Sequence, residues 1–250
     1  MDDVKEQAPR ERGRTKGPPS KTGREIWLAP FLPSLVDVYL RSGASPLYCR
    51  LTTLFVDIAG STSLLVRHPP ETVLAIIQRF MRLVTEIALA HHGDVKDFEG
   101  DGALLYFGSA AHATQAALAI QAAFSYRRYE ACEATDQVTP RMSLTVGDVV
   151  VGIVGSTMRQ AIALVGRSVS VGARLLKQIP PGAIIASGEL VEALRAEAPV
   201  LAEEFRLLDS ACQVSGADGI SVTTYVAPCP KPCGPDMSLT ASAHRSHPWN

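Results

Sequence analysis

Two stretches of this chain decide its fold: Phe55-Val56-Asp57-Ile58-Ala59-Gly60-Ser61-Thr62 and Lys96-Asp97-Phe98-Glu99-Gly100-Asp101-Gly102. Each places an aspartate beside glycine where an apolar run ends. Residues 51–58 are apolar and rich in threonine, which predicts a buried strand. Residues 94–98 and 103–107 flank the second glycine turn and predict a hairpin. We therefore expect two aspartates at neighbouring strand ends.

The apolar residues elsewhere follow helical and extended periods in turn. Residues 71–91 carry apolar side chains at helical spacing and predict a long helix, and the alanine-rich residues 110–127 predict another. Further strands are expected at 141–146, 149–154, 162–165, 184–186, 205–208 and 220–226, with helices at 168–178 and 189–196. The order strand, helix, hairpin, helix, strand predicts an α+β fold, a ferredoxin-like antiparallel sheet with helices packed on one face.

Composition limits the classes of protein to consider. The chain has 250 residues, 46% of them hydrophobic, and a formal net charge of -1. A near-neutral charge argues against a general nucleic-acid partner, because such proteins usually present a basic face. The five cysteines are scattered and odd in number, which favours a reducing, cytoplasmic setting over a disulfide framework. No run approaches the roughly 20 apolar residues of a membrane span.

The chain divides into four expected segments. Residues 1–25 are rich in Lys, Arg, Gly and Pro and predict a disordered tail. Residues 26–46 predict a short helical arm, which either joins a dimer or packs on its own domain. Residues 47–226 form the expected folded domain, and the proline-rich residues 227–250 a flexible tail.

Asp57 and Asp101 form the strongest candidate site. Two carboxylates at adjacent strand ends suit two Mg²⁺ or Mn²⁺ ions, which take oxygen ligands and leave positions for phosphate. The carbonyl of Ile58 is a third candidate ligand. The alternative is that both aspartates are ordinary turn residues, since Asp and Gly favour turns.

The loop that follows Asp57 is a candidate phosphate site. Ala59, Gly60, Ser61 and Thr62 would offer backbone N–H groups at a helix N-terminus, where anions bind. Gly60 permits close approach of a phosphate. The alternative is an ordinary helix start in which Ser61 or Thr62 is the cap.

These stretches resemble known motifs. Phe-Val-Asp-Ile-Ala-Gly-Ser-Thr, Glu-Gly-Asp-Gly-Ala-Leu-Leu-Tyr-Phe and Val-Gly-Asp-Val-Val-Val-Gly-Ile-Val-Gly are similar to three successive motifs of class III adenylate and guanylate cyclases. Residues 164–175 resemble a fourth, and the likeness covers about residues 50–226. It implies an enzyme that converts a nucleoside triphosphate to its 3′,5′-cyclic monophosphate and pyrophosphate. It also implies a head-to-tail homodimer with active sites across the interface.

The resemblance assigns roles to individual positions. Asp57 and Asp101 match the two metal aspartates. Arg174 matches the arginine that steadies the transition-state phosphate, a task that suits a guanidinium fork. The alternative for Arg174 is a structural salt bridge.

Three positions depart from the family pattern. Asp97 occupies the place of the base-reading lysine, and Lys96 is one residue too early, so only a β-bulge would turn it into the pocket. Ala163 replaces the second base-reading residue, an Asp or Thr. Ser170 replaces the ribose-orienting asparagine, one turn before Arg174.

These departures leave the substrate open. We expect ATP, because adenylate cyclase activity is the commoner implication of the resemblance. Asp97 keeps GTP as an alternative, since a carboxylate pairs well with the adjacent donors of guanine. A degenerate domain that binds nucleotide or a partner without turnover is the remaining alternative.

Overall fold

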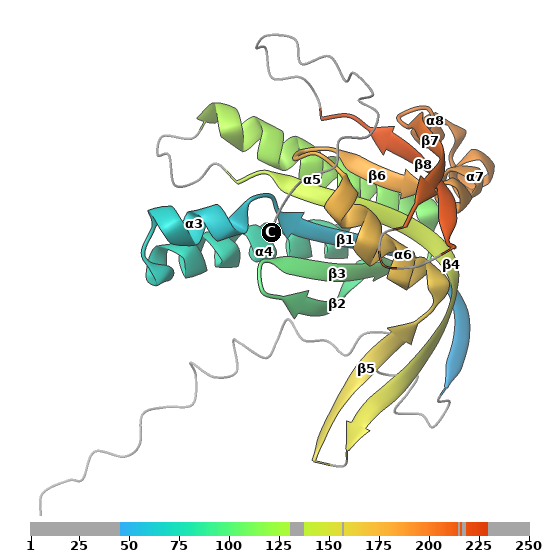
Figure 1. Cartoon of the computed structure of the whole chain (residues 1–250), viewed down its shortest axis with the longest axis horizontal. Helices are drawn as coiled ribbons and strands as arrows, with labels where there is room; N and C mark the ends of the chain where they lie inside the picture. The colour runs from blue at the N-terminus through green and yellow to red at the C-terminus, as the bar shows by residue number, and fades with distance from the viewer. Residues whose placement is uncertain (1–45, 131–137, 157, 215, 217–218, 230–250) are drawn as a thin grey trace, which may run out of the picture.

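The computed structural model describes residues 46–130, 138–156, 158–214, 216 and 219–229. Within them, eight strands form one sheet in the order β2-β3-β1-β4-β6-β8-β7, with β5 also paired to β4 (Figure 1). Their bounds are β1 (Leu47–Ile58), β2 (Gly93–Glu99), β3 (Gly102–Phe107), β4 (Pro140–Ser156), β5 (Arg159–Val165), β6 (Ile184–Ser187), β7 (Arg206–Gln213) and β8 (Ser221–Ala227). The predicted tail 1–25, the arm 26–46 apart from Pro46, and residues 230–250 of the C-terminal tail lie outside the described residues.

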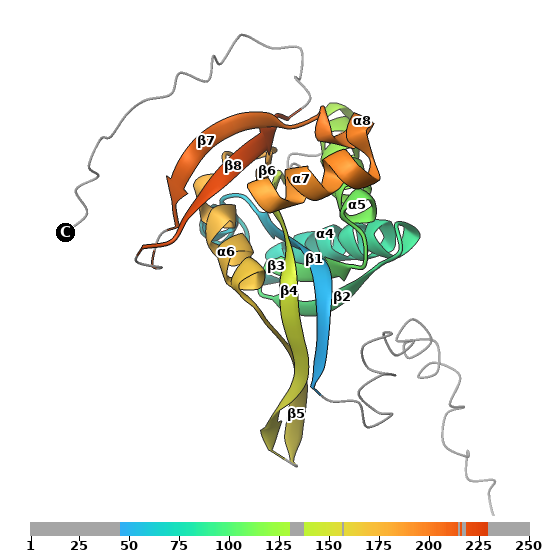
Figure 2. The ribbon, with the colours of Figure 1, turned by 90° about the vertical axis from the view of Figure 1, so that its right-hand side faces the viewer.

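Helices cover both faces of this sheet, which corrects the expectation of a single helical face. The helices are α3 (Ser61–Arg67), α4 (Pro70–Ala90), α5 (Ala110–Glu130), α6 (Arg167–Leu175), the short 3-10 helix η2 (Leu176–Gln178), α7 (Gly188–Glu197) and α8 (Pro199–Ala202). Figure 2 shows α6 on one side of β4 and β1, with α4 and α5 on the other. The α+β class is confirmed, and the sheet is mixed because β4 and β6 run parallel while the other pairs are antiparallel.

Strand alternation explains the two faces. Leu54, Val56 and Ile58 of β1 are buried in the main core, which α4 and α5 supply with side chains. The intervening Phe55 points to the other face, where a Cβ on Gly172 of α6 would lie 2.9 Å from its ring. Residues of β1 therefore alternate between the core and the face under α6, and Asp57 falls on the α6 face.

The predicted long helix is confirmed, shifted by one residue toward the N-terminus. Its buried residues recur at helical spacing on one side of α4 (Val73, Ile76, Phe80, Met81, Val84 and Ala88). Phe80 packs against Phe124 of α5 with ring centroids 4.9 Å apart. Ala113, Ala116 and Ala117 of α5 are fully buried, and their small size lets this helix lie close to the sheet.

The two strands predicted at 141–146 and 149–154 are one strand in the structure. β4 continues for 17 residues, because Gly147 and Asp148 pair with β1 instead of forming a turn. The second half of β4 leaves the body with β5 as a projecting hairpin (Figure 2). Gly155 pairs with Gln160 next to the turn and has φ of 111°, and a Cβ there would clash with the carbonyl oxygen of Arg159.

Two further findings concern membrane-spanning helices and the state of the cysteines. No helix among the described residues combines the length and apolarity needed to cross a membrane. The described cysteines Cys49, Cys212 and Cys229 are free thiols. Burial raises the pKa of Cys49, and burial together with the nearby Asp209 carboxylate raises that of Cys212.

Candidate nucleotide and metal site

The register of three central strands brings the two predicted metal carboxylates to one end of the sheet. Asp57 lies opposite Gly102 of β3, so close that a Cβ on Gly102 would be 3.5 Å from the Asp57 Cβ. Asp101 directly precedes Gly102 in a turn that Gly100 makes with φ of 62°. The two aspartates and the strand end that carries Ile58 therefore belong to one small region.

Arg141 is the residue of this region that sequence reasoning missed. It lies opposite Asp57 on β4, and its guanidinium donates two hydrogen bonds to the carboxylate, Nε to Oδ1 at 3.0 Å and Nη2 to Oδ2 at 2.9 Å. The two side chains are 27% and 19% exposed. This fork-to-carboxylate geometry fixes the orientation of Asp57 and provides a cation where phosphate is expected.

The chemistry of the donor set fits a divalent cation that also binds phosphate. Among the described residues, no group of three or more His, Cys, Asp and Glu side chains is arranged to hold a metal. The candidate site has two carboxylates, those of Asp57 and Asp101, and the main-chain carbonyl oxygen of Ile58 as possible ligands. Mg²⁺ is held in this way, by one or two carboxylates with substrate phosphates completing its shell.

The predicted phosphate loop begins α3, with one change. Gly60 is the N-cap with φ of 72° and no side-chain cap, so the expectation that Ser61 or Thr62 caps the helix is wrong. Ser63 instead donates its hydroxyl to the carbonyl of Gly60 at 2.7 Å. The N–H of Ala59 already bonds to the carbonyl of Thr139 at 2.9 Å, which leaves the helix-start N–H groups of Ser61 and Thr62 as the better donors.

A β-bulge lies at the predicted base-reading residues. The register of β2 against β3 shifts between Val95 and Asp97, so Lys96 is the extra residue. The Lys96 ammonium lies 3.0 Å from Oδ2 of Asp97, and the lysine side chain is only 16% exposed against 50% for the aspartate. The sequence required a β-bulge for Lys96 to reach the base-reading position, and the structure has that bulge.

Asp97 shares a face of the sheet with Asp57. Asp97 lies opposite Leu104 of β3, which in turn lies opposite Phe55 of β1. Cross-strand partners point to the same face, and Phe55 and Asp57 are two residues apart on one strand. Asp97 and Asp57 thus lie on the face of the sheet that carries α6.

Side-chain hydroxyls of β4 anchor α6 on this face. Ser143 donates to the carbonyl of Gly172 at 2.7 Å, and Thr145 donates to that of Ser168 at 2.9 Å. Arg174, near the end of α6, donates to the carbonyl oxygens of Ser170 and Gly216 at 3.1 and 3.2 Å. The described residues place no carboxylate against Arg174, so the salt-bridge alternative has no partner among them.

Ala163 is far from the predicted metal ligand Asp57 within one chain. It lies opposite Gly152 on the hairpin, eleven positions along β4 from Arg141. At the rise of a β-strand this spacing corresponds to about 36 Å along the strand. One chain therefore does not bring Ala163 together with Asp57.

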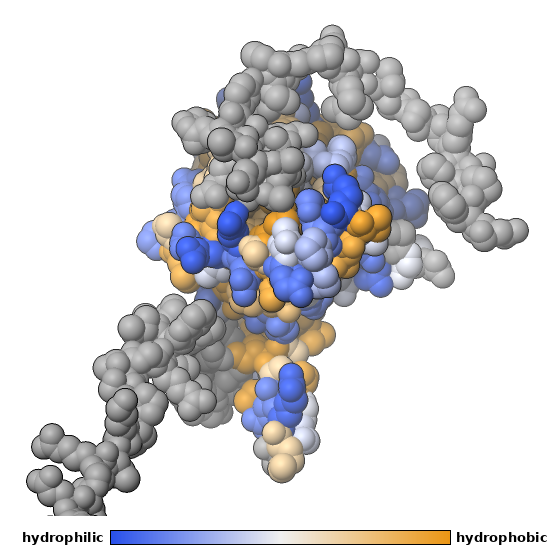
Figure 3. Space-filling view, turned by 90° about the vertical axis from the view of Figure 1, so that its left-hand side faces the viewer, coloured by the Kyte–Doolittle hydropathy of each residue, from blue (hydrophilic) through white to orange (hydrophobic). Residues whose placement is uncertain are grey.

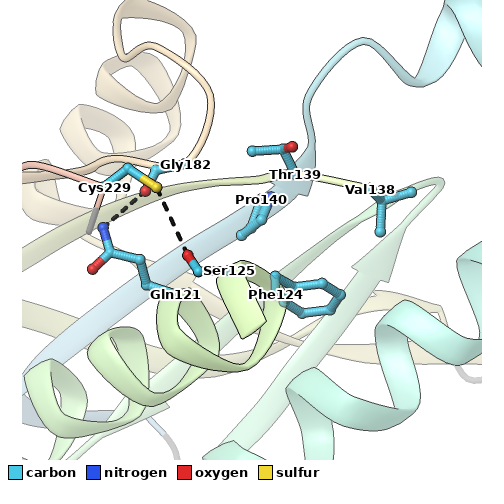
Figure 4. Close-up of a pocket in the computed structure, with 8 residues that line it drawn as sticks. All are labelled: Gln121, Phe124, Ser125, Val138, Thr139, Pro140, Gly182 and Cys229. Carbon is cyan, nitrogen blue, oxygen red and sulfur yellow. Dashed lines mark hydrogen bonds between the residues drawn. The ribbon is translucent and has the colours of Figure 1, made fainter. Parts of the chain in front are cut away.

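Neither of two hollows in the structure contains the predicted site. The smaller, a cavity of about 10 Å³, lies where α5 meets the start of β4, and Gln121 bonds to the Gly182 carbonyl beside it (Figure 4). The larger, about 300 Å³, lies beside the start of α6 and includes Arg50 and Arg167. Asp57, Asp101 and Asp97 line neither of them.

The hairpin is apolar where it projects from the body. Its exposed apolar side chains are Ile153, Val154, Met158 and Val165. Tyr48 of β1, which pairs with Val150 of β4 at the base of the hairpin, is 76% exposed. Figure 3 shows apolar surface where this arm leaves the body. Such a projecting apolar surface is typical of a contact between proteins.

Comparisons with known proteins agree with this geometry. Residues 44–226 match the model of the adenylate and guanylate cyclase catalytic domain. An uncharacterized protein of Mycobacterium tuberculosis is 32% identical over 155 residues, which are 59% of this chain and 28% of that protein. The chain thus spans less than a third of the length of that relative.

Solved structures share the fold. The adenylyl cyclase CyaB from P. aeruginosa aligns with a TM-score of 0.64 at 22% identity, over 74% of this chain and 96% of that one. The guanylyl cyclase Cya2 aligns with a TM-score of 0.63 at 23% identity, over 75% and 96%. An adenylyl and a guanylyl cyclase fit equally well, so the fold alone does not distinguish the base.

Proposed function

Because the chain belongs to the adenylate and guanylate cyclase catalytic domain family, we propose that it converts ATP to 3′,5′-cyclic AMP and pyrophosphate. The observation that carries the proposal is that Asp57 pairs with Gly102, the residue after Asp101, on one side and is held by Arg141 on the other. Carboxylates for metal ions and a cation for phosphate meet there at one sheet end.

In this proposal two Mg²⁺ or Mn²⁺ ions are held by Asp57, Asp101 and the carbonyl of Ile58. Such ions supply a lowered pKa for the attacking ribose hydroxyl and neutralise charge on the leaving pyrophosphate. The contribution of the chain is to hold the carboxylates in place, and the Arg141 fork does this for Asp57.

Arg141 has a second role in the proposal. Its guanidinium donates to both oxygens of Asp57. A triphosphate arriving beside Asp57 offers the same fork new oxygen acceptors, and bidentate phosphate binding is a strength of arginine. Arg141 then positions phosphate, while the N–H groups of Ser61 and Thr62 bind phosphate oxygens at the start of α3.

Arg174 and Ser170 are proposed to act on the reacting groups. Among the described residues, the guanidinium of Arg174 donates to the main-chain carbonyls of Ser170 and Gly216, which are weaker acceptors than phosphate. It is proposed to stabilise charge on the α-phosphate as the ribose 3′ hydroxyl attacks in line. Ser170, one turn earlier, is proposed to orient the ribose with its hydroxyl.

A homodimer is part of the proposal. Asp57 and Asp101 line neither of the two hollows of a single chain, and the base-reading position Ala163 lies about 36 Å from Arg141 along β4. A head-to-tail pair would build each site from two chains. The apolar hairpin arm supports such a contact, and the free thiols of the described cysteines support a cytosolic setting.

The test is a turnover assay of the full chain with Mn²⁺ and either ATP or GTP, with the cyclic product identified by mass. Cyclic AMP that disappears in Asp57→Asn, while the variant keeps its fold and oligomeric state, supports the proposal. Absence of cyclic product from both nucleotides with a folded dimer contradicts it.

The same assay addresses two further candidates. Cyclic GMP as the main product would establish a guanylate cyclase, which the carboxylate of Asp97 favours. A domain that binds nucleotide without turnover is favoured by Ala163 and Ser170, which lack the reach of the usual side chains. Nucleotide binding measured by calorimetry, with no product, would identify it.

A further inference from the structure

Helix α6 is held on the sheet by buried hydroxyl groups as well as by apolar side chains. Ser143 of β4 donates to the carbonyl of Gly172 at 2.7 Å, and Thr145 donates to that of Ser168 at 2.9 Å. The two donors have exposed fractions of 0% and 1%. The helix therefore receives two directed bonds from the strand beneath it, in a place that water does not reach.

The spacing of these two bonds fixes α6 along its axis. Residues two apart on a strand are separated by about 6.6 Å, and residues four apart on a helix by about 6 Å. Ser143 and Thr145 therefore match the carbonyls of Gly172 and Ser168 in reverse order. Apolar contacts have no direction, so they alone would let the helix slide or turn on the sheet. The two hydroxyl bonds set both its position and its rotation.

A third buried hydroxyl orients Thr145. Thr53 lies opposite Thr145 on β1, and the two hydroxyl oxygens are 2.9 Å apart. A hydroxyl has one hydrogen to donate, and Thr145 gives its hydrogen to Ser168, so Thr53 is the donor of this bond. A chain of hydrogen bonds thus runs from β1, the strand that carries Asp57, to α6.

Two glycines let α6 lie close enough to the sheet for these bonds. A Cβ on Gly172 would be 2.9 Å from the ring of Phe55 and 3.0 Å from the hydroxyl oxygen of Thr145. A Cβ on Gly147 would be 2.8 Å from the Cβ of Ser168. A side chain at either glycine would therefore push the helix away from the hydroxyl donors.

We propose that Ser143 and Thr145 are positioning residues for the reaction, because they fix the helix that carries Arg174. Ser170 lies between the two anchored carbonyls, and Arg174 lies two residues beyond the second. Packing alone gives no reason for a hydroxyl at position 145, since valine has nearly the same shape and favours strands. The inference rests on the proposed cyclase function and goes beyond it by naming residues that act through α6.

The first experiment removes one hydroxyl at a time. Thr145→Val and Ser143→Ala should each lower kcat by about tenfold to a hundredfold, because a displacement of about 1 Å at a reacting group costs up to that factor. KM should change little, since Arg174 is proposed to act on charge that develops in the transition state. Thr145→Ser keeps the hydroxyl and should recover most of kcat.

A double-mutant cycle shows whether this loss passes through Arg174. In an Arg174→Ala background, Thr145→Val should lower kcat by less than about threefold, because the group that it displaces is already absent. A merely structural role would lower kcat by the same factor in both backgrounds. That result would overturn the inference.

Thr224→Val is the matched control. Thr224 of β8 is 0% exposed, and its hydroxyl also donates to a main-chain carbonyl, that of Asp209 at 3.5 Å. This bond leads to β7 and not to α6. The variant should keep the kcat and KM of the wild type, with urea unfolding measured alongside. A loss of kcat as large as that of Thr145→Val would also overturn the inference.

Hydrogen exchange separates this inference from the proposed function. Wild-type turnover that Thr145→Val and Ser143→Ala leave unchanged overturns the inference and leaves the cyclase standing. If the wild type turns over neither ATP nor GTP, the cyclase proposal fails. The anchoring of α6 is then decided by amide hydrogen exchange, measured by mass spectrometry. Faster exchange confined to residues 167–175 in both variants supports it, and unchanged exchange overturns it.

Discussion

The two halves of the candidate site lie in different parts of the sheet. The phosphate half, with Asp57, Asp101 and Arg141, lies where central strands meet, and Asp57 has a strand on each side. The base half lies on the edge strand β2, which pairs only with β3, and on the projecting hairpin. A central strand restrains its residues through two ladders of hydrogen bonds, whereas an edge strand accommodates a bulge with one. The base half therefore tolerates changes in register and residue type that the phosphate half does not.

The largest expected effect lies in the phosphate half. Asp57→Asn and Asp101→Asn should each lower turnover by about 10² to 10³ or more, the range for losing one electrostatic group at a reacting centre. Circular dichroism and chromatography should show an intact fold and oligomer. If either variant kept near wild-type turnover, the phosphate half would not be the more sensitive part of the site.

Arg141 should come next. Arg141→Ala leaves the partly buried Asp57 carboxylate without its two donors, and we expect unfolding free energy to fall by about 1–3 kcal/mol. Activity should fall about tenfold or more, through KM as well as kcat. Arg141→Lys should recover part of the stability but little of the activity, because an ammonium lacks the fork. Urea unfolding and steady-state kinetics measure both.

Mixing two inactive chains tests whether the halves come from different subunits. If each site takes Asp57 from one chain and Arg174 from the other, Asp57→Asn mixed with Arg174→Ala restores one good site per mixed dimer. Random exchange of subunits then gives about a quarter of wild-type activity. No recovery, with exchange verified by differently tagged chains, would indicate that one chain holds the whole site.

The smallest effect concerns the missing acceptor at Ala163. Ala163→Asp should raise several-fold the preference for ATP over purine riboside triphosphate, which lacks the 6-amino group, because it places a carboxylate at the second base-reading position. The neighbouring Ala161→Asp serves as the control, since it lies on the same strand but away from the family position. An equal gain in both variants would point to a general charge effect and not to base reading.

The accuracy of prediction also differs between the two halves. The strand, helix and hairpin that carry Asp57 and Asp101 were predicted within a few residues, since apolar periodicity and glycine turns are local signals. The bulge was foreseen only as a condition for Lys96, because a register shift depends on how β2 hydrogen-bonds to β3. Residues 141–154 were predicted as two strands, and the pairing of Gly147 and Asp148 with β1, which is a long-range contact, joins them into one.

The sequence by itself determined the α+β class, the resemblance to nucleotide cyclases and the pair of aspartates at glycine turns, because these depend on neighbours along the chain. Only the tertiary structure decided that Arg141 faces Asp57, 84 residues away, that a bulge brings the Lys96 ammonium to Asp97, and that Ala163 is remote from Asp57. The physical reason is that strand register arises from long-range hydrogen bonding and burial, and a slip of one residue reverses every side chain.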